Sequence, residues 1–102
     1  MRKIIIKVLI SGVFITLISS CGSQPTADFK WSPQTPKAGE KVTFTNTSLD
    51  AKSYSWNFGD MSIGSEVNPV HIYKNKGSYI IDLSVHNGLK SDVKTVTITI
   101  TD

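Results

Sequence analysis

The chain has 102 residues, of which 39% are apolar and 9% aromatic, and it contains a single cysteine. This length suits one small domain, and one cysteine excludes both an internal disulfide and a multi-cysteine zinc site. The formal net charge of +3 comes from Arg2, Lys3 and Lys7, because the chain from residue 21 onward carries eight lysines and eight carboxylates, so no basic stripe remains there for nucleic acid.

Residues 1–20 combine a basic start with a long apolar run, which is typical of a secretory signal. Thirteen residues lie between Lys7 and Cys21. As a helix they would reach about 20 Å, which is short of the ~30 Å hydrocarbon core of a bilayer. We therefore expect residues 1–20 to be a helical signal peptide rather than a membrane-spanning anchor.

The signal segment ends in the sequence Ile-Ser-Ser-Cys at residues 18–21, which resembles a bacterial lipobox. The resemblance implies that Cys21 is lipidated and attaches the chain to the membrane of the bacterial cell envelope, at the outer membrane or cell surface. The alternative is a buried free thiol or a redox or metal ligand. Residues 21–26 are then the lipidated cysteine and a polar linker, whose five residues after Cys21 reach about 17 Å when extended.

From Ala27 onward apolar and polar residues alternate with a period of two, which predicts half-buried β-strands. The residues that share the apolar face of each run are Ala27, Phe29 and Trp31, then Val42 and Phe44, then Tyr54, Trp56 and Phe58, then Tyr79, Ile81, Leu83 and Val85, and finally Val96, Ile98 and Ile100. Turn residues separate the runs and no helical apolar stripe is present. Residues 27–102 are therefore predicted to be one all-β Greek-key sandwich.

The sequence Asn87-Gly88 is the usual signal for a two-residue hairpin turn. That register would place Lys90, Asp92 and Lys94 on the apolar face of the preceding strand, at a high cost in buried charge. We therefore expect a longer loop, with Ile98 opposite Ile81 or Leu83.

Several short motifs in this region together resemble the PKD domain, an immunoglobulin-like β-sandwich of about seven strands found in extracellular and bacterial surface proteins. The motifs are Ala27-Asp28-Phe29, Val42-Thr43-Phe44, Trp56-Asn57-Phe58-Gly59-Asp60, Asn68-Pro69 with His71 and Tyr73, and Gly77-Ser78-Tyr79. The chain departs from the family pattern at Met61, where a second glycine usually follows the aspartate. This departure suggests that the flexible point of the loop moves to Gly64.

The sequence WNFGD could belong to a binding site, a catalytic site or the core, and its alternation favours the core. Trp56 and Phe58 share a face and are expected to be buried. Gly59 is expected to take a positive φ, and Asp60 to cap turn amides. The alternation around residues 70–73 does not decide which side chains point inward, while the resemblance implies that His71 is a structural hydrogen-bonding residue.

No constellation of residues predicts catalysis or a cofactor. His71 and His86 lie in separate strands with no strained elbow for a nucleophile, and two histidines at this spacing do not form a zinc site. Some PKD-like domains hold calcium, for which the resemblance offers Asp28, Asp50 or Asp60 as weak oxygen ligands. Solvated or capping carboxylates are the simpler interpretation, so no metal is expected.

These observations predict a non-catalytic, lipid-anchored surface module that binds a protein partner. The alternative is a carbohydrate-binding or adhesion module associated with polysaccharide processing. Sugar binding generally needs exposed aromatic faces. Trp31 shares its face with Phe29 and is expected to be mostly buried, which leaves Tyr73 as the remaining candidate, a poor platform on its own.

Overall fold

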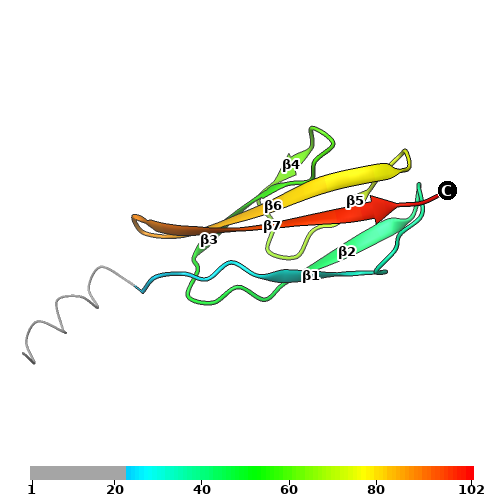
Figure 1. Cartoon of the computed structure of the whole chain (residues 1–102). Helices are drawn as coiled ribbons and strands as arrows, with labels where there is room; N and C mark the ends of the chain where they lie inside the picture. The colour runs from blue at the N-terminus through cyan, green and yellow to red at the C-terminus, as the bar shows by residue number, and fades with distance from the viewer. Residues whose placement is uncertain (1–22) are drawn as a thin grey trace, which may run out of the picture.

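The computed structural model describes residues 23–102, which form two antiparallel β-sheets packed face to face (Figure 1). The strands are β1 (Phe29–Ser32), β2 (Lys41–Asn46), β3 (Ser53–Asn57), β4 (Ile63–Gly64), β5 (Val70–Ile72), β6 (Gly77–Asn87) and β7 (Lys90–Ile100). One sheet has the order β1-β2-β5 and the other β4-β3-β6-β7. The prediction of an all-β sandwich with about seven strands is confirmed. The predicted signal peptide and Cys21 lie outside the described residues.

The core consists of the inward residues of both sheets, as the alternation predicted. Its fully or nearly fully buried apolar members are Ala27, Phe29, Val42, Phe44, Trp56, Phe58, Tyr73, Ile81, Leu83, Val85, Ile98 and Ile100. Phe29 meets Trp56 edge-on with ring centroids 5.1 Å apart, which joins the two sheets at the centre. Burial of each large apolar side chain contributes about 1.5–3 kcal/mol. Over residues 23–102, no helix is long and apolar enough to cross a membrane.

The hairpin between β6 and β7 differs from the prediction. Its turn has two residues, Gly88 and Leu89, because Asn87 pairs with Lys90, and Ile98 lies opposite Tyr79 rather than Ile81 or Leu83. The prediction of a longer loop is therefore wrong. The register also differs from the one that a turn formed by Asn87 and Gly88 would give, because the turn residues are Gly88 and Leu89.

Three charged residues, Lys90, Asp92 and Lys94, consequently lie on the side of β7 that carries Ile98 and Ile100. Asp92 is opposite Val85, and its carboxylate accepts the backbone N–H of Ala27 at 2.8 Å. Lys94 is opposite Leu83, and its Nζ lies 3.9 Å from the Asp28 carboxylate at a half-exposed position. The segment entering β1 supplies polar partners to Asp92 and Lys94, which reduces the cost of placing charges on this face.

The predicted linker is largely part of the domain. Pro25 is fully buried and Thr26 forms a β-bridge with Leu49. The Gln24 side chain donates to the Ser91 carbonyl at 2.9 Å. Residues 23–26 are thus packed against the sandwich instead of acting as a free spacer, because the backbone groups of this polar segment find partners on the hairpin and the β2–β3 loop.

Candidate functional site

The aromatic residues of WNFGD are inside the molecule. Trp56 is completely buried near the end of β3, and its indole N–H donates to the Glu66 carbonyl at 2.8 Å. Phe58 is also buried, with its ring parallel to that of Trp56 at a centroid distance of 6.0 Å. This part of the motif is therefore unable to present an aromatic surface to a ligand.

The turn after β3 depends on Gly59, which takes a φ of +84° as expected. A Cβ at this position would lie 2.4 Å from the carbonyl oxygen of Ile80, so the strand β6 passes too close for any side chain. The next positive φ is +75° at Met61, a fully exposed residue, whereas Gly64 is not in that region. The expected shift of the flexible point to Gly64 is therefore wrong, and the methionine adopts the glycine-like conformation itself.

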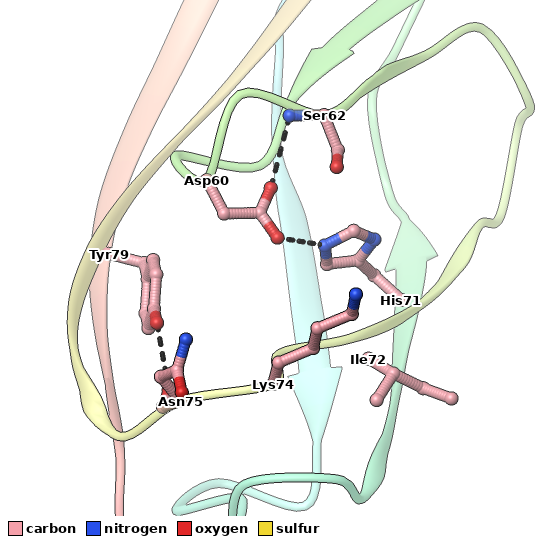
Figure 2. Close-up of a pocket in the computed structure, with 7 residues that line it drawn as sticks. All are labelled: Asp60, Ser62, His71, Ile72, Lys74, Asn75 and Tyr79. Carbon is pink, nitrogen blue, oxygen red and sulfur yellow. Dashed lines mark hydrogen bonds and ion pairs between the residues drawn. The ribbon is translucent and has the colours of Figure 1, made fainter.

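Asp60 links the turn to the neighbouring sheet. One carboxylate oxygen accepts the Ser62 backbone N–H at 3.1 Å, and the other is 2.7 Å from His71 Nε2 (Figure 2). Partial burial acts to raise the pKa of Asp60, but the hydrogen bonds from His71 and Ser62, together with the attraction of His71, outweigh it and lower the pKa below its usual 3.8. The capping role expected for Asp60 is thus accompanied by a tertiary contact.

His71 in β5 and Tyr73 directly after it point to the inner side, which resolves the alternation that the sequence left open. Val42, a core residue, pairs with His71, and opposed residues share a face. The imidazole lies parallel to the Phe58 ring at 4.3 Å. Three contacts, with Phe58, Asp60 and Tyr73, hold this ring in place, which is the arrangement of a structural histidine.

Tyr73 is 1% exposed, and its hydroxyl donates to the Phe58 carbonyl at 2.8 Å. Burial, followed by electrostatic repulsion from Asp60 and Tyr79, raises the pKa of this phenol far above its usual value. Tyr73 is therefore a neutral donor that holds the end of the WNFGD strand, and it is not available as a sugar platform.

A polar pocket of about 440 Å³ opens beside the Asp60–His71 pair. It is lined by Asp60, Ser62, His71, Ile72, Lys74, Asn75 and Tyr79 (Figure 2). The Tyr79 hydroxyl donates to the Asn75 carbonyl at 2.8 Å, which ties the β5–β6 loop to β6. The pocket can offer an ammonium group, a carboxylate and a hydroxyl to a small polar ligand or to a polar segment of a partner.

Sequence reasoning missed the pocket because Ser62, Lys74 and Asn75 lie in loops. Strand periodicity carries no information about loop side chains, so only the turn composition of residues 59–64 and 74–77 marked these loops. The Ser62 group that bonds Asp60 is its backbone N–H, and the partner of His71 is the carboxylate. This geometry differs from a nucleophilic triad, in which the serine hydroxyl is hydrogen-bonded to the histidine.

The other expected motif residues occupy defined structural positions. The buried Pro69 uses its carbonyl to accept the Phe44 backbone N–H at 2.9 Å. Gly77 opens β6 with a φ of +146°. Trp31 is partly buried, and its indole N–H donates to the Gln34 carbonyl at 3.2 Å. Cys21, the expected lipidation site, is outside the described residues.

The three weak calcium candidates are not brought together. Asp60 is engaged by His71, Asp28 lies near Lys94 and accepts the Phe29 backbone N–H, and Asp50 occupies a loop with a φ of +54°. In residues 23–102 no group of three or more histidine, cysteine, aspartate or glutamate side chains could hold a metal ion.

The fold and the buried motif define a small immunoglobulin-like β-sandwich module. The profile of the PKD domain family matches residues 22–101, and the chain belongs to this family. It has 30% identity and a TM-score of 0.66 to the PKD1 domain of the Vibrio cholerae metalloprotease PrtV, covering 78% of this chain and all of that domain.

Larger proteins contain similar segments. A structure of carbohydrate-binding modules from the β-sandwich superfamily has a TM-score of 0.75 and 32% identity, over 79% of this chain and 36% of that one. The collagenase ColA of Bacillus cereus is 43% identical over 42 residues, which are 41% of this chain. The aligned part is only 4% of the collagenase, so the likeness concerns a small part of that enzyme.

Proposed function

We propose that the protein is a non-catalytic interaction module of the bacterial cell envelope, anchored by lipid at Cys21 and binding a protein partner. Membership of the PKD family supports a binding module. The lipobox-like residues 18–21 support the anchor, and the position of the only cysteine directly before the packed segment 23–26 agrees with it.

The composition of the exposed apolar surface is the observation that favours a protein partner. In the described part of the chain, every exposed large apolar residue is aliphatic or methionine, and the aromatic rings are buried or half-buried. Five of these exposed residues fall within residues 61–72, here called the edge segment: Met61, Ile63, Val67, Val70 and Ile72.

The edge segment contains β4 and β5, which are edge strands of the two sheets. Edge strands with free backbone groups can pair with an extended segment of another protein, and neighbouring aliphatic side chains then supply apolar contact. A surface of this kind suits a polypeptide better than a sugar, which stacks on aromatic rings.

The binding surface can be tested with a photo-crosslinking amino acid placed at Ile63 in cells that produce the full chain. We expect a discrete crosslinked protein species that is lost when Val70 and Ile72 are both changed to serine. The matched control is the crosslinker at Thr97, an exposed position on the outer face of β7. Equal crosslinking from Ile63 and Thr97 would contradict a specific surface at the edge segment.

The anchor is tested separately by Cys21→Ser. We expect the variant to lose labelling by a fatty-acid probe and to leave the membrane fraction, because firm anchoring depends on the several acyl chains that bacterial lipidation supplies. Unchanged labelling and membrane retention would overturn the lipoprotein assignment.

The second candidate is carbohydrate binding, favoured by the similarity to the carbohydrate-binding modules. Partly buried Trp31 is the main aromatic candidate, since Tyr73 is in the core. We expect retention on insoluble polysaccharides no greater than that of a control protein. Retention that Trp31→Ala abolishes would favour the glycan function instead.

A further inference from the structure

We propose that the end of the sandwich formed by the β6–β7 turn and the β2–β3 loop rests on the lipid surface, with Leu89 and Leu49 in the membrane interface. This inference rests on the proposed lipidation of Cys21, and it adds the orientation of the domain and the residues that touch the bilayer.

The first described residues are fixed to this end of the molecule. The Asn87 side chain, one residue before the turn, donates to the Ser23 carbonyl at 3.1 Å and to the Asp50 carbonyl at 2.9 Å. Thr26 and Leu49 exchange two backbone hydrogen bonds of 3.0 and 2.9 Å. Figure 1 shows the start of the described chain beside the β6–β7 turn, with the C-terminus at the opposite end.

The chain between the anchor and this end is very short. Only Gly22 separates Cys21 from Ser23, so their Cα atoms are at most about 7 Å apart. This is comparable to the ~5–10 Å depth at which interfacial apolar groups reside in a bilayer. A lipid on Cys21 therefore holds the β6–β7 turn at the membrane surface. A free linker of five residues would instead have allowed a distance of about 17 Å between Cys21 and the domain.

The side chains at this end suit a lipid surface. Leu89 is fully exposed at the tip of a two-residue turn, a position normally occupied by glycine, asparagine or aspartate. Leu49 is 63% exposed in the β2–β3 loop, which Asn87 joins to the same end. Two leucines that the described residues leave largely exposed would gain from contact with the acyl chains of a lipidated Cys21.

The orientation places the pocket and the edge segment away from the membrane. Tyr79, which lines the pocket, is eight residues before Asn87 on β6, so it lies about 27 Å further from the turn along the strand. Gly59, next to Asp60, contacts β6 at Ile80, close to the same level. A partner can therefore approach the end of the sandwich that carries the pocket, here called the pocket end. The opposite end, formed by the β6–β7 turn and the β2–β3 loop and here called the hairpin end, faces the bilayer.

The test uses the full chain, processed in cells, purified and reconstituted into phosphatidylcholine–phosphatidylglycerol vesicles. An environment-sensitive fluorophore is attached through Leu89→Cys, since an acylated Cys21 has no free thiol. The matched control is Met61→Cys, because Met61 is equally exposed and is two residues from Gly59, which contacts Ile80 rather than the β6–β7 turn. Both substitutions are at surface positions and leave the core intact.

We expect the probe at position 89 to shift to shorter emission wavelength and to be quenched at least twofold more by a lipid-attached quencher than the probe at position 61. Equal quenching at the two positions in a vesicle-bound, fatty-acylated protein would overturn the orientation and leave the anchor intact. Absence of fatty-acid incorporation would overturn the anchor and the orientation together.

Discussion

The two ends of the sandwich are held together by different kinds of residue. At the pocket end, Gly59, Asp60, His71 and Tyr73 fix a turn through a close backbone approach, a carboxylate–imidazole contact and a buried hydroxyl. At the hairpin end, short polar side chains bind the segment that enters β1, as in the contact between Asp92 and Ala27. The pocket end is built by a contiguous motif and its partner strand, whereas at the hairpin end Ser23 and Ala27 bind residues that lie 64 and 65 positions further along the chain.

This difference explains why the contacts at the pocket end are easier to predict from the sequence than those at the hairpin end. Gly59, Asp60, His71 and Tyr73 lie in recognisable motifs, whereas Asp92 looks like an ordinary strand residue until the N-terminal segment is placed beside it. The predictions below test whether the two ends have the stabilities that these contacts imply.

The largest effect is expected for Gly59→Ala. The new Cβ would lie 2.4 Å from the Ile80 carbonyl oxygen in a backbone with a φ of +84°, so strain and steric overlap should lower the free energy of unfolding by about 3 kcal/mol or more. Gly39→Ala is the matched control, because its φ is +85° but nothing lies within 4 Å of the added atom. It should lose only about 1–2 kcal/mol. Urea denaturation measures both, and equal losses would contradict the close approach.

At the hairpin end, Asp92→Ala should lower the free energy of unfolding by about 1–2 kcal/mol, because the Ala27 N–H loses its acceptor in a partly buried position. The same variant should speed hydrogen exchange at Ala27. The control is Asp82→Ala, which removes an exposed contact with the Thr95 hydroxyl and should change stability by less than about 0.5 kcal/mol. If both variants behave alike, Asp92 does not hold the N-terminal segment.

The Asp60–His71 contact predicts a dependence on pH. Because the pKa of Asp60 is lower in the folded protein than its usual 3.8, the unfolded chain binds more protons between the two values, and stability rises with pH there. The contribution is complete above the unfolded pKa and is lost as the pH falls through the folded one. Asp60→Asn should be less stable at pH 7 and should lose less stability than the wild type between about pH 5 and 2. Parallel curves for the two proteins would rule out this linkage.

The sequence predicted most of the fold because the strand alternation and the PKD motifs agree. The burial of Trp56 and the positive φ of Gly59 followed from parity and from glycine's conformational freedom. The register of the hairpin did not follow, since it depends on the acceptor that Asp92 offers to a distant amide. The inward direction of His71 and Tyr73 also needed the structure, because Val70 and Ile72 gave an equally apolar alternative.

The smallest effect, and one of opposite sign, is expected for Met61→Gly. Met61 has a φ of +75° and a fully exposed side chain, so replacement removes about 1–2 kcal/mol of left-handed strain without losing packing. The greater freedom of glycine in the unfolded chain offsets part of this, which leaves a net gain in stability of about 0.5–1 kcal/mol. Asp50→Gly, at a φ of +54°, is a useful comparison, because aspartate tolerates this conformation better and the gain should be close to zero. Thermal and urea unfolding of both variants measure the difference. A Met61→Gly variant no more stable than the wild type would mean that the turn at the pocket end is not strained, and that its geometry is already relaxed around the methionine.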